Sequence, residues 1–182
     1  LNYYLFKDPP LFNGYINLSP DLAPLMDERL PERIPQIQSK IFYYLATGSD
    51  DLKYLRESTE MLHDALKSIE NKNFEYNFDN FDGATHYSLV GRGIPTALEK
   101  IFKVYRPISK EEFSEVIMKL DTPVHLYLLE KYQTIETLFG ITNPIRENDF
   151  IAAGVAADKK KQWESLREIG SLAKRQYPDK IM

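Results

Sequence analysis

The sequence lacks several features that would tie it to a particular chemistry. Its 182 residues include no cysteine, which excludes disulfide bonds, thiolate metal ligands and a cysteine nucleophile. No apolar run approaches the length of about 20 residues that a membrane-spanning helix needs. The 23 Lys and Arg residues against 27 Asp and Glu give a net charge of -4, without the basic excess that binds nucleic-acid phosphates. We therefore expect no membrane span, no nucleic-acid partner and no thiol chemistry.

The chain also does not begin with methionine. Leu1 opens an apolar and aromatic stretch that runs to Lys7 and is stopped by Asp8-Pro9-Pro10, since proline cannot continue a helix. A stretch of this kind, without a starting cap, is typical of the last turns of a helix, and we expect further residues before Leu1. Composition does not fix the compartment, and we expect a periplasmic or secreted location rather than a cytoplasmic one.

The first half of the chain alternates strand and helix patterns. Ile41 to Thr47 is a continuous run of apolar and β-favouring residues ended by Gly48, which predicts a strand covered on both faces. This alternation indicates an α/β domain, in which helices cover a mostly parallel sheet. Three strands are too few for such a sheet, so we expect more of it upstream. The other predicted elements are strands at 14–18 and 74–78, helices at 53–70 and 94–105, and an irregular segment at 21–39.

From Pro107 the composition changes to a helical one. Ser109 with Glu112 forms a capping box, Thr122-Pro123 marks a second helix start, and residues 163–177 are a third helical stretch. We therefore expect a division of the chain into two parts, an α/β part at 1–106 and a helical extension at 107–182. Trp163, Leu166 and Gly170 are similar to the first helix of a tetratricopeptide repeat, so the extension is also a candidate start of a helical repeat region, although one imperfect copy establishes no period.

Candidate catalytic residues follow two of the predicted strands. Catalytic residues of open α/β sheets gather at the carboxyl ends of strands, where loops converge above a rigid scaffold. Asp50 and Asp51 follow the central strand, and His86 follows the strand that ends near Phe78. An acid after one strand and a histidine after the next is an order in which a carboxylate can orient an imidazole for proton transfer.

Each of these residues also has a structural interpretation. Aspartates after a Gly-Ser turn commonly cap the next helix, and Asp50 or Asp51 could accept backbone N–H bonds there. His86 could equally be a loop histidine that bonds the backbone. We interpret the other histidines, His63 and His125, as structural. Because no cluster of histidines and carboxylates has the spacing of a metal site, we expect no metal and no other cofactor.

A serine nucleophile is missing from the sequence. A nucleophile elbow needs small residues around its serine, in the pattern G-x-S-x-G, because the tight strand-to-helix turn leaves no room for side chains. The pattern does not occur here, and we interpret Ser19, Ser49 and Ser88 as turn and cap residues. Since an elbow stands at the start of a helix and Leu1 to Lys7 has the pattern of a helix end, we place the missing serine one or two turns before Leu1.

The first half contains three segments that resemble one protein family: YLFKDPPLFNGYINLSPDL, IFYYLATGSDD and FDNFDGATHYSLVGRGIPTALEKIF. The family is a group of α/β-hydrolases that includes enterochelin-type, feruloyl and acetyl-xylan esterases. The resemblance is to its C-terminal half and covers about residues 1–105. It implies a three-layer sandwich with a mostly parallel sheet, and the activity of a serine carboxylic-ester hydrolase on a small-molecule or carbohydrate-linked ester.

The resemblance also implies roles for single residues. By position, His86 is similar to the general base of the family and Asp51 to its triad acid, with Asp50 as the rival one residue away. Without a serine and oxyanion-hole donors, we expect the 182 residues alone to be inactive. The residues implied to border the substrate are Ser19, Asp21 and Tyr87.

A second hypothesis differs in class. It describes a non-catalytic protein of the same fold whose helical part, residues 107–182, mediates protein interaction; the absence of a serine at the elbow would favour it. Under either hypothesis a partial sheet leaves an unpaired edge and a bare apolar face. This edge predicts a homo-oligomer formed by pairing of two copies.

Overall fold

The chain forms two compact units. The computed structural model describes residues 1–179, and the first unit is Leu1–Phe102, while the second begins at Lys103. Composition places the division slightly later, between residues 106 and 107. Each unit has its own buried apolar core, so the two are described separately.

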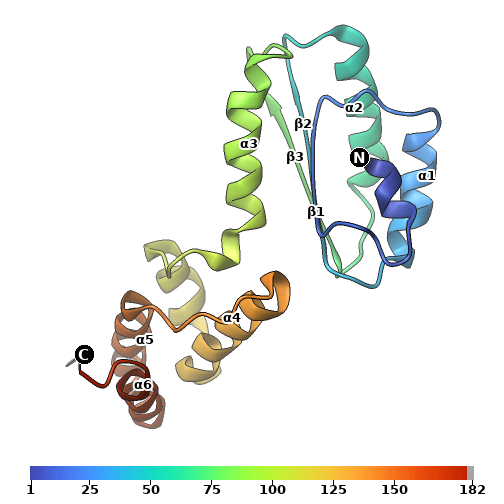
Figure 1. Cartoon of the computed structure of the whole chain (residues 1–182). Helices are drawn as coiled ribbons and strands as arrows, with labels where there is room; N and C mark the ends of the chain where they lie inside the picture. The colour runs from blue at the N-terminus through green and yellow to red at the C-terminus, as the bar shows by residue number, and fades with distance from the viewer. Residues whose placement is uncertain (180–182) are drawn as a thin grey trace. The chain divides into compact units, whose positions relative to one another are not determined.

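A parallel sheet forms the centre of the first unit (Figure 1). Its strands are β1 (Gly14–Leu18), β2 (Ile41–Gly48) and β3 (Phe74–Phe81), in the order β1-β2-β3. Every residue of β2 is buried, whereas most residues of β3 are half-buried. The apolar run and the alternating run of the sequence therefore predicted these two strands and their burial correctly.

The two faces of the sheet pack against different helices. Alternate residues of a strand point to opposite faces. Tyr43 of β2 joins the core formed with α1 (Met26–Arg33) and α2 (Lys53–Leu66), whereas its neighbour Tyr44 joins the core formed with α3 (Ser88–Ile101). Figure 1 shows α1 and α2 on one side of the strands and α3 on the other. The result is a helix–sheet–helix sandwich, and the predicted α/β fold class is confirmed.

Two segments near the start of the chain differ from the expectation. The segment at 21–39, expected to be irregular, contains α1 followed by a 3-10 turn at Ile34–Gln36. Its prolines suggest a loop, but burial of Met26 and Leu30 in the core that α1 shares with α2 and the strands stabilises α1 despite a proline inside it. Residues Asn2–Phe6 form a 3-10 helix rather than the end of an α-helix.

The helix expected at 94–105 begins earlier, at Ser88. Its first turns contain Gly91 and Gly93, which lowered the helical signal of the sequence. Gly93 is required by packing, because a Cβ at this position would lie 2.6 Å from Leu18 Cδ2 on β1. The glycine therefore lets α3 approach the sheet closely.

The second unit is helical. Ser109 Oγ accepts the Glu112 N–H at 3.0 Å, so the expected N-terminal cap is present, but the Glu112 carboxylate binds Lys131 Nζ at 2.8 Å. Only half of the expected capping box therefore forms. α5 is a separate helix whose start no sequence pattern predicted. The elements are 3-10 turns at Lys103–Tyr105 and Ile117–Lys119, a π-helical turn at Glu112–Val116, and α4 (Val124–Phe139), α5 (Glu147–Lys159) and α6 (Trp163–Gln176).

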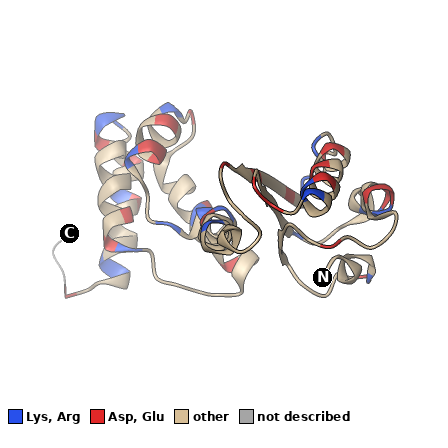
Figure 2. Cartoon of the chain, turned by 90° about the horizontal axis from the view of Figure 1, so that it is seen from above, with Lys and Arg blue, Asp and Glu red and all other residues tan. Residues whose placement is uncertain are grey.

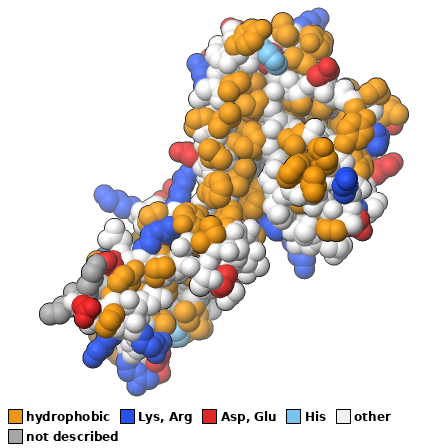
Figure 3. All heavy atoms as spheres, viewed as in Figure 1, with side chains coloured by type: hydrophobic (Ala, Val, Ile, Leu, Met, Phe, Trp, Pro, Cys, Tyr) orange, Lys and Arg blue, Asp and Glu red, His pale blue; other side chains and the backbone are white. Residues whose placement is uncertain are grey.

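The surface carries one line of apolar side chains. Val90, Ile94 and Leu98 lie four residues apart on α3 and are exposed, and Figure 3 shows hydrophobic side chains along this helix. Lysine and arginine are interspersed with acidic residues along the helices of both units (Figure 2). Within residues 1–179, β1 pairs with β2 alone, so pairing of two copies through this edge stays a prediction. None of the helices in that range has the length and apolar character needed to cross a membrane.

Candidate active site

The parallel register brings the loops after β2 and β3 to one edge of the sheet. Gly48, the last residue of β2, lies beside Phe81, the last residue of β3. Beyond these residues the two loops remain bonded to each other, because the Ser49 N–H donates to Phe81 O at 3.0 Å and the Asp50 N–H donates to Ala84 O at 3.1 Å. Residues far apart in the sequence are thus fixed next to one another.

Asp51 and His86 meet at this edge. His86 Nδ1 lies 3.0 Å from Asp51 Oδ1, and the Asp51 side chain is 0% exposed while the His86 side chain is 37% exposed. Because an ionised carboxylate only accepts hydrogen bonds, the bond places a proton on Nδ1 and leaves Nε2 as the nitrogen that can accept one. Catalytic triads use the same arrangement, in which a carboxylate fixes the tautomer of an imidazole.

The neighbouring aspartate has a different environment. Asp50 is exposed, and its Oδ1 accepts a hydrogen bond of 3.2 Å from the adjacent Ser49 hydroxyl. The acid that bonds His86 is therefore Asp51. Neither aspartate is the N-cap residue of α2, which is Leu52, but Asp51 does accept a backbone N–H at this helix start, as its structural interpretation expected.

The two oxygens of Asp51 are used unequally. Oδ1 accepts both the His86 bond and the Leu52 N–H, at 2.6 Å. Oδ2 is buried and has no hydrogen-bond partner among the described residues. Burying a polar atom in this state costs about 1–3 kcal/mol, so this carboxylate is a poor stabiliser of the fold.

The residues expected to border the substrate lie in different places. Ser19 is buried at the end of β1, and its hydroxyl lies 2.8 Å from Thr47 Oγ1 on β2. This hydroxyl bonds across the ends of two strands, and a contact between Ser19 and a substrate stays a prediction. Tyr87 is 89% exposed, and its ring contacts the ring of His86 edge-on with centroids 5.8 Å apart. Asp21 lies on the exposed segment after β1.

His63 has the structural role expected of it. Its ring stacks on Phe78 with centroids 3.9 Å apart, and its Nδ1 lies 2.9 Å from the Tyr76 hydroxyl. Burial, more than any nearby charge, lowers the pKa of His63. This histidine is therefore neutral at neutral pH and belongs to the packing between α2 and β3.

His125 lies beside a serine in the second unit. Its Nδ1 is 3.1 Å from Ser165 Oγ, and the same oxygen accepts the backbone N–H of His125 at 2.8 Å. Ser165 is buried within α6, and the hydrogen bonds of the described residues give His125 no carboxylate. The pair ties α4 to α6 and lacks the acid and the access that a nucleophile needs. Across the described range, no cluster of three or more potential ligands could hold a metal ion.

Sequence reasoning missed the importance of two residues next to Asp51. A Cβ on Gly48 would lie 2.1 Å from Ala84 O, so only glycine lets the two loops touch. Arg56, in the first turn of α2, donates from Nη1 to Ser49 O at 2.5 Å and holds the turn from the other side. The sequence signal for Gly48 is its place between a strand and an acidic turn. That position indicates the end of the strand but not the close approach to Ala84.

Comparison with known proteins gives two solved structures. No protein-family model and no curated protein sequence matches the chain. A crystal structure of an uncharacterised protein from Capnocytophaga ochracea DSM 7271 is 28% identical, with a TM-score of 0.84, over 96% of this chain and 49% of that one. An IroE-like serine hydrolase from Shewanella oneidensis is 17% identical, with a TM-score of 0.57, over 92% of this chain and 53% of that one.

The two solved structures indicate the fold of this chain and how much of each longer chain it matches. The chain has an α/β fold that is similar to that of a serine hydrolase. It spans about half the length of the two solved chains that it matches.

Proposed function

We propose that this chain carries the acid and the base of a serine carboxylic-ester hydrolase. In this proposal Asp51 orients His86, and a serine from another part of the protein is the nucleophile. The observation that carries the proposal is the bond of 3.0 Å between a buried carboxylate and a solvent-facing imidazole, at the carboxyl ends of neighbouring parallel strands. The likeness in fold to a serine hydrolase supports it.

The chemistry follows from the tautomer of His86. Nε2 accepts the proton of the serine hydroxyl as its oxygen attacks the ester carbonyl, and the imidazolium formed is stabilised by Asp51. His86 then returns the proton to the departing alcohol, which leaves an acyl-enzyme. Water attacks the acyl group with the same histidine as base, and the serine is released.

The serine and the oxyanion donors have to come from outside the 182 residues, which contain no G-x-S-x-G pattern. Both solved chains that match are about twice as long as the part matched, so a protein of their size has room for these groups. We propose that the remaining part of the protein supplies them, and that the 182 residues alone are inactive.

The test uses the complete natural protein that contains this chain. Hydrolysis of p-nitrophenyl acetate is measured for wild type, His86→Ala and Asp51→Asn, with Asp50→Asn and His125→Ala as matched controls. We expect both site variants to lose about 10³–10⁴-fold in kcat, and both controls to keep the wild-type rate. A fluorophosphonate should label one serine of the wild type, identified by mass spectrometry.

Two outcomes would overturn the proposal. One is a wild-type rate in His86→Ala. The other is a complete protein with no hydrolysis and no labelled serine, which would favour the non-catalytic alternative. Equal losses in Asp50→Asn and Asp51→Asn would remove the assignment of the acid.

A further inference from the structure

The turn between β2 and α2 (residues 49–52, the acid turn) and the loop between β3 and α3 (residues 82–87, the histidine loop) are each held by an arginine of the helix that follows. Arg56 of α2 donates to Ser49 O at 2.5 Å, and Arg92 of α3 donates to Asp82 O at 2.6 Å. Each arginine thus fixes its own loop to its own helix. Neither of these bonds sets the distance from one loop to the other.

One side chain crosses between the loops. The Ser49 hydroxyl accepts the Gly83 N–H at 2.7 Å, in addition to donating to Asp50. Gly83 has a φ of +65°, a backbone conformation that favours glycine and that turns its N–H toward the acid turn. Ser49 is two residues before Asp51, and Gly83 is three residues before His86. The bond between Ser49 and Gly83 therefore joins the two loops just before the residues that form the acid–histidine pair.

The bond lies next to the closest backbone approach of the two loops. Gly48 precedes Ser49 and leaves no space for a Cβ beside Ala84, while the Asp50 N–H binds Ala84 O. Backbone contacts therefore join the loops at Gly48 and at Asp50, on either side of Ser49, and the bond between Asp51 and His86 follows directly after them. The Ser49 hydroxyl, through its bond to the Gly83 N–H, adds a side-chain link that opposes twisting and separation of the two loops.

We propose that Ser49 is a positioning residue, whose hydroxyl holds the histidine loop against the acid turn and so keeps His86 Nδ1 within bonding distance of Asp51. This inference rests on the proposed function for its kinetic consequence. The structural part of it concerns the Asp51–His86 bond alone. Ser49 contacts neither substrate nor nucleophile in this proposal.

The main experiment follows the Nδ1 proton of His86 in the complete protein. Histidine is labelled with ¹⁵N, the His86 signal is identified by its loss in His86→Ala, and its exchange with water is measured. In Ser49→Ala we expect exchange to be about five- to tenfold faster, the range that follows from losing one hydrogen bond. Ser49→Thr keeps the hydroxyl and should restore the slow exchange.

The matched control is Ser58→Ala. The Ser58 hydroxyl bonds only within α2, to Leu55 O at 3.0 Å, so its removal should leave His86 exchange unchanged. A general loosening of the fold would speed exchange in both variants, whereas a positioning role changes only the Ser49 variant. Unchanged exchange in Ser49→Ala would overturn the proposal.

Kinetics give a second readout. Ser49→Ala should lower kcat about five- to tenfold and leave KM unchanged, and it should have no further effect in an Asp51→Asn background, because Ser49 acts through the pair. If the complete protein hydrolyses no ester, the proposed function fails while the exchange experiment still decides the role of Ser49. If Ser49→Ala lowers kcat equally in both backgrounds, the positioning role fails alone.

Discussion

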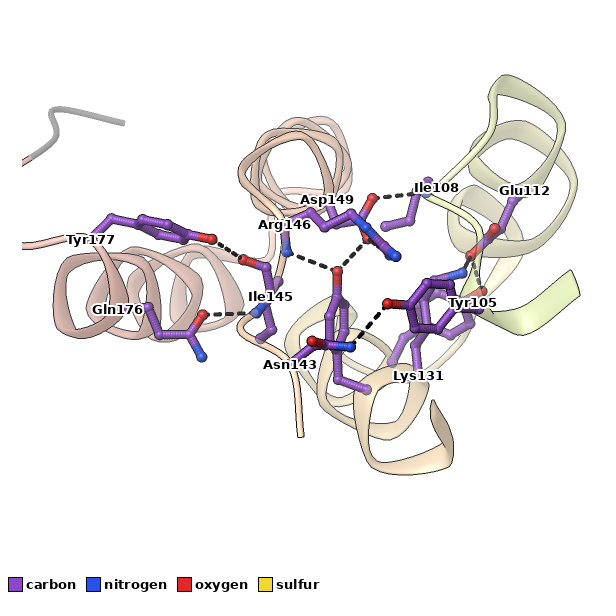
Figure 4. A network of polar contacts seen from close by, with 12 residues as sticks. Tyr105, Ile108, Glu112, Lys131, Asn143, Ile145, Arg146, Asp149, Gln176 and Tyr177 are labelled. Atoms are coloured by element: carbon purple, nitrogen blue, oxygen red, sulfur yellow. Dashed lines mark hydrogen bonds and ion pairs between the residues drawn. The ribbon is translucent and has the colours of Figure 1, made fainter. Parts of the chain in front are cut away.

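Each unit buries one aspartate, and the two differ in how their oxygens are used. The Asp149 side chain is 1% exposed; its Oδ1 accepts the Ile108 N–H at 2.8 Å and its Oδ2 accepts the Tyr132 hydroxyl at 2.7 Å, with Arg146 Nη1 at 3.8 Å (Figure 4). The Asp51 side chain is 0% exposed, and one of its oxygens carries both hydrogen bonds while the other carries none.

The difference separates a carboxylate that stabilises the fold from one for which we propose a catalytic role. Every partner of Asp149 belongs to the frame of the helical unit, so the cost of burying its charge is offset within that unit. The side-chain partner of Asp51 is a histidine that is open to solvent. Burial alone is thus a poor indicator of function, and the exposure of the partner is a better one.

The largest expected effect separates the two aspartates by activity. In the complete protein, Asp51→Asn should lower kcat by about 10⁴-fold, because an amide can no longer hold the correct tautomer or stabilise the imidazolium. Asp149→Asn should leave kcat of the folded protein unchanged. Steady-state hydrolysis of p-nitrophenyl acetate measures both, and comparable losses in the two variants would contradict the distinction.

The second effect concerns stability, for which we expect the Asp149 variant to lose more than the Asp51 variant. Asp149→Ala leaves the Ile108 N–H and the Tyr132 hydroxyl without their acceptor and the Arg146 guanidinium without the carboxylate 3.8 Å away. The helical unit should therefore lose about 3–5 kcal/mol. Asp51→Asn should change the free energy of unfolding by less than about 1 kcal/mol, since half of that carboxylate is already unbonded. Urea unfolding followed by circular dichroism checks this; a larger loss in Asp51→Asn would refute it.

A smaller effect tests the other buried charge of the helical unit. The Lys131 side chain is 5% exposed and its Nζ lies 2.8 Å from Glu112 Oε1, which also accepts the Tyr127 hydroxyl (Figure 4). Lys131→Met should destabilise the unit by about 2–3 kcal/mol, because it leaves Glu112 without its cation. Adding Glu112→Leu should recover most of the loss. An additive double variant in urea unfolding would show that the two residues do not act as a pair.

The smallest effect is a change of stability in alkali. Burial, as the largest cause, raises the pKa of Tyr132 from 10.0 to about 12, and its bond to Asp149 acts in the same direction. Because the pKa of Tyr132 is higher in the folded state, its contribution to the free energy of unfolding is complete below about pH 10 and is lost as the pH rises toward about 12. Tyr132→Phe should therefore show a shallower fall of unfolding free energy over this range. An unchanged slope in the variant would assign the fall to other groups.

Local sequence patterns predicted two strands of the first unit, β2 and β3, but not the helix α1. The continuous run of β2 and the alternation of β3 are periodic and bounded by turn residues, so their positions and burial could be predicted. α1 could not, because its prolines indicate a loop and burial of Met26 and Leu30 in the core, a tertiary effect, stabilises the helix.

The candidate site shows the same limit at the level of single residues. Strand order brings an acid and a histidine to one edge, and sequence alone predicts this much. The choice of Asp51 over Asp50 depends on how the turn after Gly48 is held, and the holding bonds run to Phe81 and Ala84. Such contacts are set by the parallel register, which no local pattern reveals. The buried contacts of Asp149 are likewise tertiary, and sequence analysis did not single it out.

The backbone approach at Gly48 also determines where this protein can vary. An inserted residue in the acid turn or the histidine loop would break the bonds that join the two, so their lengths should be conserved among proteins that keep the pair. In the segment between β1 and β2, by contrast, Arg33 and Ile34 form hydrogen bonds with Leu5, Lys7 and Asn71, none of which belongs to the two loops. The sequence can therefore diverge through that segment without breaking the bonds that join the two loops.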